Sequence, residues 1–225
     1  MGERTMSFLP KILVFDFDGV LVDSNEMKYQ AWLELFPHHQ DFMRDVLSTM
    51  YYHTRFVILR HINERVGAPE EKQKKESWIR DYAEKYNAIV GQGVSRLGCI
   101  PGVCEALEFL SLKYRLFINS GTIEESLQES VRDLGISHFF VRVFGASRTK
   151  AENLARIMYQ ERASSHEIVM IGDGDPDYSA ARHYGIFFIG VTNTWNGWAN
   201  KEFPLVSHIA DITPIIKAHF AKKKT

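Results

Sequence analysis

Acidic residues that follow short apolar runs are the part of this sequence best suited to chemistry. Asp16 and Asp18 follow one such run, and Asp173 and Asp177 follow another. Carboxylates that crowd together repel one another and favour a hard cation such as Mg²⁺, which prefers oxygen ligands. The pattern therefore predicts a metal site built from these four residues.

Groups suited to holding a phosphate follow two further apolar runs. Ser120 and Thr122 offer hydroxyls, and Gly121 between them lets backbone N–H groups approach a ligand. The helix expected next would present its positive end to an anion. Lys150, expected at the first position of another helix, adds a full positive charge. Together with the acids, these groups predict a site for a phosphate and a metal.

The apolar runs also predict the elements that must position these residues. They lie at residues 11–15, 115–118, 141–144, 168–171 and 186–191. Continuous apolar runs of this length are typical of strands buried on both faces, as in a parallel sheet. Helical patterns separate the last four, which predicts a doubly wound, mostly parallel α/β fold. Ligands of such sheets bind beyond the carboxyl ends of the strands, so we expect the polar groups to converge there.

Several helix starts carry capping signals. Capping boxes are predicted at Thr122 with Glu125 and at Thr149 with Glu152. A cap followed by a proline is predicted at Asp175-Pro176 and at Thr213-Pro214.

The stretch at residues 24–97 has a different pattern from the remainder of the chain. Its apolar residues follow helical spacing, and no strand-like run interrupts them. We therefore expect an α/β core at residues 1–23 and 98–225, with an all-helical domain inserted at residues 24–97.

Four motifs in order resemble those of the haloacid dehalogenase (HAD) superfamily. The run Asp16-Phe17-Asp18-Gly19-Val20-Leu21-Val22-Asp23-Ser24 resembles the first motif, and Ile118-Asn119-Ser120-Gly121 resembles the second. Lys150 fits the third motif, and Gly172-Asp173-Gly174-Asp175-Pro176-Asp177 resembles the fourth. The helical insertion resembles, in position and length, the small cap of the phosphoglycolate-phosphatase and β-phosphoglucomutase branch.

The resemblance implies a role for each matching residue. Asp16 would be the nucleophile that attacks phosphorus and becomes an aspartyl phosphate. Asp18 would protonate the leaving oxygen and later activate water. Ser120 and Lys150 would hold the transferring phosphoryl oxygens.

The metal roles are implied in the same way. Asp173 would bind Mg²⁺ together with the Asp16 carboxylate and the Asp18 backbone carbonyl. Asp177 would support the metal or orient the lysine of the third motif. That lysine often stands in Gly-Lys-Pro, whereas here Arg148 precedes Lys150 by two residues and could compete for the role.

The carboxylate at Asp18 narrows the implied reaction, because dehalogenases of the superfamily lack one at that position. We therefore expect a Mg²⁺-dependent phosphatase that hydrolyses a small phosphomonoester metabolite through an aspartyl phosphate. A phosphomutase of the β-phosphoglucomutase type is the nearest alternative. A non-catalytic regulator that binds a phosphorylated ligand is an alternative of another class.

Other residues have both a functional and a simpler explanation. Arg55 and Lys28 could contact a second anionic group of the substrate, or they could be solvated surface charges. Trp195 and Trp198 could line the mouth of the site, or they could pack within a loop.

Composition limits the class of partner and the compartment. The 225 residues include 27 basic and 28 acidic side chains, so the basic surplus of a nucleic-acid-binding protein is missing. No apolar run has the length of a signal peptide or a membrane span. Cys99 and Cys104 are expected as reduced thiols. We expect a cytoplasmic protein, a monomer or weak homodimer, that contacts neither membranes nor nucleic acids.

Overall fold

A computed structural model describes residues 10–221. The chain forms two compact units, which we describe separately. The first, called the α/β unit below, combines Met1–Val22 with Cys99–Thr225, and the second, called the helical unit, is Asp23–Gly98.

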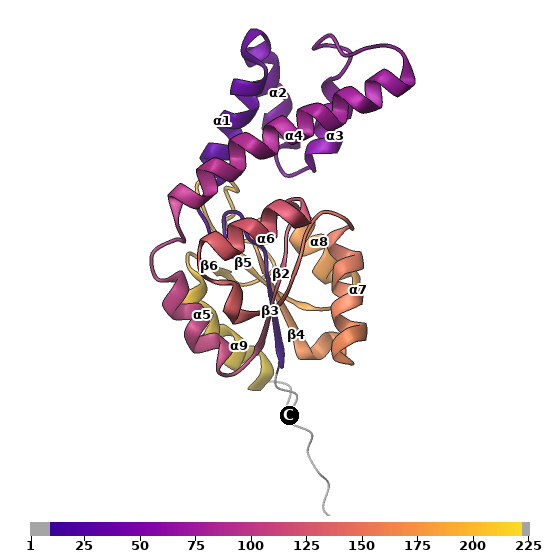
Figure 1. The fold of residues 1–225 in the computed structure, drawn as a ribbon. Coiled ribbons are helices and arrows are strands. Elements are labelled where there is room, and N and C mark those ends of the chain that lie inside the picture. Colours follow the sequence, from indigo (N-terminus) through magenta and orange to yellow (C-terminus); the bar gives the residue numbers. More distant parts are fainter. Residues whose placement is uncertain (1–9, 222–225) are drawn as a thin grey trace, which may run out of the picture. The chain divides into compact units, whose positions relative to one another are not determined.

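The α/β unit is built on a six-stranded parallel sheet (Figure 1). The strands are β1 (Ile12–Phe15), β2 (Arg115–Asn119), β3 (Phe140–Phe144), β4 (Ile168–Gly172), β5 (Phe187–Val191) and β6 (Leu205–Val206). Their order is β3-β2-β1-β4-β5-β6, which confirms the predicted doubly wound α/β fold. β6 was not predicted, because a strand of two residues is too short to carry a pattern.

Helices cover this sheet. They are α5 (Val103–Ser111), α6 (Glu124–Asp133), α7 (Lys150–Glu161), α8 (Asp175–His183) and α9 (Ile212–Ala221). Short 3₁₀ turns lie at η2 (Ser137–Phe139), η3 (Ser165–Glu167) and η4 (Ile209–Asp211). α7 and α8 pack against each other, while α5 and α9 lie together on another side of the sheet (Figure 1).

The core of the α/β unit lies at the centre of its sheet. Every residue of β1 and β4 is buried, as expected for strands covered on both faces. The prediction is wrong for β3, whose Val141 is 47% exposed. β3 is one of the two edge strands of the sheet, so its cover is incomplete.

The capping predictions had mixed outcomes. The box at Thr149 is confirmed, because its hydroxyl accepts the Glu152 N–H and the Glu152 carboxylate accepts the Thr149 N–H. The box at Thr122 is wrong, since Ile123 is the N-cap of α6. The Thr122 hydroxyl donates instead to Asp18, at 2.9 Å.

The two proline signals mark helix starts with an error of one or two residues. α8 begins at Asp175 with Gly174 as its N-cap, so Asp175 is not the cap that was predicted. α9 begins at Ile212, which places Thr213 inside the helix. Pro176 lies in the first turn of α8, and Pro214 lies in the first turn of α9. A proline in the first turn costs no hydrogen bond, because N–H groups there have no partner within the helix.

The helical unit contains α1 (Asn25–Leu35), η1 (Pro37–His39), α2 (Gln40–Met50), α3 (Arg55–Ile62) and α4 (Lys72–Leu97). No strand occurs among its residues, as predicted for this stretch. α4 packs against α1 and α3. Aromatic rings form part of its core: ring centroids lie 4.4 Å apart for Trp32 and Tyr86, and 5.2 Å apart for Phe36 and Tyr82.

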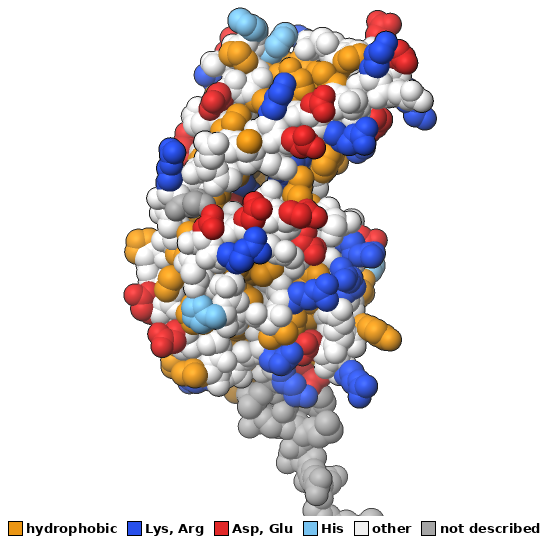
Figure 2. Space-filling view, viewed as in Figure 1, with side chains coloured by type: hydrophobic (Ala, Val, Ile, Leu, Met, Phe, Trp, Pro, Cys, Tyr) orange, Lys and Arg blue, Asp and Glu red, His pale blue; other side chains and the backbone are white. Residues whose placement is uncertain are grey.

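Two surface properties bear on partners. None of the helices described between residues 10 and 221 combines the length and apolar character needed to cross a membrane. Basic and acidic side chains are interspersed over the face shown in Figure 2, in line with the net charge of −1.

Candidate active site

Three buried carboxylates meet at the carboxyl ends of the central strands. Asp16 directly follows β1, Asp173 directly follows β4, and Asp177 lies in the first turn of α8. One carboxylate oxygen from each of the three lies within 4.8 Å of the other two. We call Asp16, Asp173 and Asp177 the acid cluster. The predicted convergence of these acids is therefore present in the structure.

Lys150 binds two members of the acid cluster. Its Nζ lies 2.7 Å from Asp16 Oδ2 and 2.6 Å from Asp177 Oδ1. Burial lowers the pKa of this ammonium group, but the two carboxylates outweigh burial and hold the pKa above its ordinary value. Lys150 is therefore protonated at neutral pH and carries a fixed positive charge at the site.

Local structure explains why Lys150, rather than Arg148, reaches the acids. The capping box at Thr149 makes Lys150 the first residue of α7. The Asn119 side chain, at the end of β2, donates to the Lys150 carbonyl at 2.9 Å. Arg148 is exposed, and its charge acts on Glu152. Of the two candidate cations, Lys150 is the one that contacts the acid cluster.

Asp177 lies in an unfavourable electrostatic position for a carboxylate. Burial raises its pKa well above the ordinary value, the charge of Asp16 raises it further, and Lys150 opposes both effects only in part. Gly172 makes the position possible, because a side chain at Gly172 would collide with the Asp177 carboxyl group. The Gly174 N–H donates to Asp177 Oδ2 at 3.2 Å.

The charge balance of the cluster fits a divalent cation. Three buried acids face one lysine, so negative charge is in excess. Besides the lysine, Asp16 has only a backbone N–H, that of Phe17 at 2.7 Å from Oδ1, among its described partners. An all-oxygen donor set with excess negative charge is the environment that Mg²⁺ prefers.

Asp18, which is half-buried, lies in a second group with the buried Ser120 and Thr122. Its Oδ2 accepts hydrogen bonds from the Thr122 hydroxyl at 2.9 Å and the Ser120 hydroxyl at 3.4 Å. Its carboxylate is therefore directed at hydroxyls and does not join the acid cluster. The turn that carries it needs Gly19, whose φ of 72° lies in the left-handed region. Gly121, on the opposite loop, is exposed.

Arg55 and Lys28 belong to the helical unit. Arg55 is only 7% exposed, and its guanidinium lies 5.2 Å from the centre of the Tyr86 ring. It is therefore not a solvated surface charge, and it makes a cation–π contact within its own unit. Lys28 is half-buried, and its carbonyl accepts the Tyr86 hydroxyl at 3.3 Å.

The sequence analysis missed two asparagines beside the acid cluster. Asn193 and Asn196 follow β5 and donate to the Asp173 side chain and backbone, respectively. The signal for them was available, because they follow an apolar run just as the acids do. Trp198, in the same loop, packs on Phe188 and Phe203 within the core.

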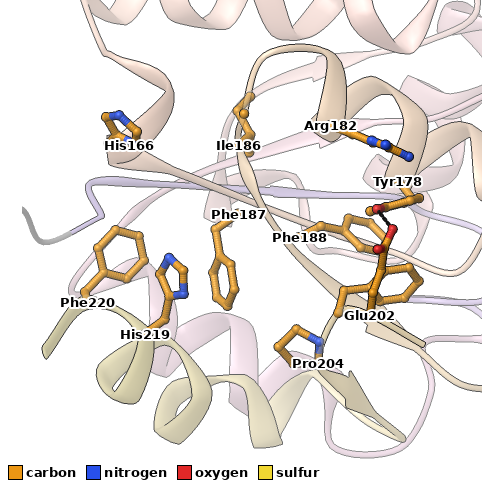
Figure 3. Close-up of a pocket in the computed structure, with 12 residues that line it drawn as sticks. His166, Tyr178, Arg182, Ile186, Phe187, Phe188, Glu202, Pro204, His219 and Phe220 are labelled. Atoms are coloured by element: carbon orange, nitrogen blue, oxygen red, sulfur yellow. Dashed lines mark hydrogen bonds between the residues drawn. The ribbon is translucent and has the colours of Figure 1, made fainter. Parts of the chain in front are cut away.

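A cavity of about 420 Å³ lies elsewhere on the α/β unit. Figure 3 shows its lining, in which the Phe187 and His219 rings stack and Tyr178 is hydrogen-bonded to Glu202. Phe187 begins β5, whereas the acid cluster lies at the carboxyl ends of strands. No member of the acid cluster is among its described lining residues, so this cavity is separate from the candidate active site.

The acid cluster and Lys150 lie at the carboxyl ends of parallel strands. This arrangement is that of an α/β enzyme with its site at the strand ends. A family model described as haloacid dehalogenase-like hydrolase matches residues 13–191. The chain therefore belongs to this family of hydrolases, and the predicted membership is confirmed.

Individual relatives are more distant. The chain is 25% identical over 211 residues to pyrophosphatase PpaX of Listeria welshimeri, covering 90% of this chain and 88% of the relative. It is 27% identical over 201 residues to a phosphorylated carbohydrates phosphatase of Thermotoga maritima. The match covers 82% of this chain and 86% of that relative.

Solved structures share the fold. A β-phosphoglucomutase from Clostridium difficile superimposes with a TM-score of 0.74 at 18% identity, covering 96% of this chain and 99% of the other. A predicted phosphoglycolate phosphatase from Haemophilus somnus gives a TM-score of 0.72 at 18% identity. The match covers 93% of this chain and 99% of the other.

Proposed function

We propose that the protein is a Mg²⁺-dependent phosphatase that hydrolyses a small phosphomonoester through an aspartyl phosphate on Asp16. The observation that carries this proposal is the contact of Lys150 Nζ with both Asp16 and Asp177 inside the acid cluster. The names of the relatives agree with it, since one is a pyrophosphatase and another a phosphatase of phosphorylated carbohydrates.

The first half of the reaction forms the covalent intermediate. A carboxylate oxygen of Asp16 attacks phosphorus, and the bond from phosphorus to the leaving oxygen breaks with its electron pair on that oxygen. Asp18 gives its proton to the leaving group. Ser120 and Lys150 stabilise the negative charge on the transferring phosphoryl group.

The second half regenerates the enzyme. Asp18, now a carboxylate, takes a proton from a water molecule that attacks the phosphorus of the aspartyl phosphate. The bond from phosphorus to the Asp16 oxygen breaks, which releases inorganic phosphate and restores the Asp16 carboxylate. The Thr122 hydroxyl, which donates to Asp18, holds the Asp18 carboxylate in place between the two steps.

The acid cluster would hold the metal ion. Asp16, Asp173 and Asp177 would bind Mg²⁺ with the Asp18 backbone carbonyl, and the ion would neutralise charge on the phosphoryl group. Asp177 would also keep Lys150 in place, as its 2.6 Å contact suggests.

We further propose that the helical unit is a cap that selects the substrate. Its place in the chain, between β1 and the rest of the sheet, supports this role. Arg55 and Lys28 are its candidates for contact with a second anionic group. Replacing Lys28 by Ala should raise KM for such a substrate without changing kcat, whereas Arg55→Ala should also destabilise the unit, because Arg55 is buried.

A cytoplasmic setting for this reaction agrees with the two free cysteines, because a reducing compartment preserves thiols.

Phosphate release from a panel of metabolite phosphates tests the proposal. Wild-type protein should release phosphate with Mg²⁺ and lose this activity with a chelator, and Asp16→Asn should be inactive while folded. Comparable turnover by Asp16→Asn would contradict the aspartyl phosphate. An isomerised sugar phosphate without free phosphate would indicate a mutase, and tight binding without turnover would indicate a regulator.

A further inference from the structure

The loop after β5 holds one carboxylate of the acid cluster with a neutral amide. We propose that Asn193 is a positioning residue, which orients Asp173 for the metal ion. Asn193 Nδ2 donates to Asp173 Oδ2 at 2.7 Å, and Asp173 is only 2% exposed. The inference rests on the proposed function, in that it takes Asp173 as a metal ligand.

The direction of the Asn193 side chain is set by its own partners. Its Oδ1 accepts the Trp195 N–H at 2.9 Å and the Asn196 N–H at 3.1 Å. Backbone N–H groups only donate, so the amide oxygen must face them and the amide nitrogen must face Asp173. The loop thereby fixes which end of the amide reaches the carboxylate.

Asn196 ties this loop to the ends of two strands. Its Nδ2 donates to the Asp173 carbonyl at 3.0 Å and to the Val191 carbonyl at 2.8 Å. Its Oδ1 accepts the Trp198 N–H at 3.1 Å. One side chain therefore links the residue after β4, the last residue of β5 and the loop that carries Asn193.

Trp198 anchors the loop in the core. It is 9% exposed, and its ring centroid lies 6.2 Å from Phe188 and 5.2 Å from Phe203. Core packing thus sets the position of the loop, and the loop sets the position of Asn193. Ligating carboxylates generally have such outer partners, which orient them and raise metal affinity.

A neutral donor suits this position better than a cation. Lys150 already offsets charge on Asp16 and Asp177. A second cation, at Asp173, would cancel more of the negative charge that attracts a divalent ion. The amide of Asn193 donates to Oδ2 of Asp173 and adds no charge.

Direct metal binding by Asn193→Ser tests this inference. Serine can still accept the two backbone N–H bonds of the loop, more weakly, but its shorter side chain does not reach Asp173. Binding of Mn²⁺, which takes the same oxygen ligands as Mg²⁺, can be followed by paramagnetic resonance without substrate. We expect affinity to fall by about 10- to 100-fold.

Three further readouts separate positioning from a structural role. Thr194→Ala, in the same loop with an exposed side chain, should bind Mn²⁺ as wild type does. The thermal midpoint of Asn193→Ser in chelator should stay close to that of wild type. The kcat of Asn193→Ser should approach the wild-type value at saturating Mg²⁺, because only the occupancy of the site is impaired.

The outcomes are distinguishable. Equal Mn²⁺ affinity of Asn193→Ser and wild type would overturn the inference and leave the proposed function intact, as would an equal loss in Thr194→Ala. A wild-type protein that binds no Mn²⁺ would overturn both the inference and the metal part of the proposed function. Should Asn193→Ser not fold, Asn193→Thr provides the same comparison, because its hydroxyl can also accept the two loop N–H bonds.

Discussion

The two units of the chain differ in the charged side chains that they bury beside their apolar cores. The α/β unit buries three carboxylates and most of a lysine, whereas the helical unit buries aromatic rings together with Arg55. Burying charge costs free energy that aromatic packing does not. The excess of buried negative charge therefore marks the α/β unit as the one that carries the candidate active site.

The largest effect on stability is expected in the helical unit. Phe36 is 4% exposed, and its ring stacks on Tyr82. Phe36→Ala should cost about 3–5 kcal/mol of unfolding free energy, since it removes a buried ring and leaves a cavity. Urea unfolding measures this loss, and Val57→Ala, at a 41% exposed position, is the control. Mn²⁺ affinity should not change in Phe36→Ala. A fall in Mn²⁺ affinity along with stability would contradict the assignment of the metal site to the α/β unit alone.

The next effect concerns the α/β unit and is seen in turnover. Lys150→Met should lower kcat by about 10²- to 10³-fold, because it removes a fixed charge at the transferring phosphoryl group. Arg148→Met is the matched control, two residues away and exposed, and should retain activity. Steady-state kinetics of both variants shows whether Lys150 or Arg148 supplies this charge. An equal loss in the two variants would contradict the assignment of the third-motif cation.

A smaller effect is the pH dependence of stability without metal. The pKa of Asp177 is raised in the folded protein, so between its ordinary value of about 3.9 and the raised value the folded state binds more protons than the unfolded state. The stability contributed by this group is therefore lost as pH rises through that range. Unfolding in chelator from pH 4 upward should show this loss, and Asp177→Asn should lessen it. A parallel pH profile in the variant would argue against the raised pKa.

The smallest effect concerns Cys99, the residue at which the second chain segment of the α/β unit begins. Burial, with Cys104 nearby, raises the pKa of the Cys99 thiol to about 12. At pH 8 only about one part in 10⁴ is thiolate, the reactive form. Iodoacetamide should therefore modify the exposed Cys104 well before Cys99, as peptide mass spectrometry can show. Faster labelling of Cys99 would contradict the raised pKa.

Much of the α/β unit could be predicted from sequence, because its signals are local. Apolar runs mark the buried strands, and the rule that ligands bind at strand ends brings Asp16, Asp173 and Asp177 together. The capping box at Thr149 places Lys150 correctly for the same reason: it depends on residues three apart.

Other features depend on partners that are remote in sequence. The Thr122 hydroxyl matches a capping signal, yet its partner in the fold is Asp18, 104 residues away. Asn193 likewise acts on Asp173, 20 residues earlier. Short-range patterns do not show which residues pair over such distances in the chain. β6 was missed for a different reason, because two residues are too few to form a pattern.

Trapping of the covalent intermediate tests the central claim most directly. Wild-type protein with Mg²⁺ and a labelled generic phosphomonoester, quenched in acid within the first turnover, should carry label that hydroxylamine removes, with Asp16 as the labelled residue. The Asp16→Asn variant should carry no label. Label on another residue, or phosphate release by wild type with no labelled protein at any time, would contradict the aspartyl-phosphate mechanism.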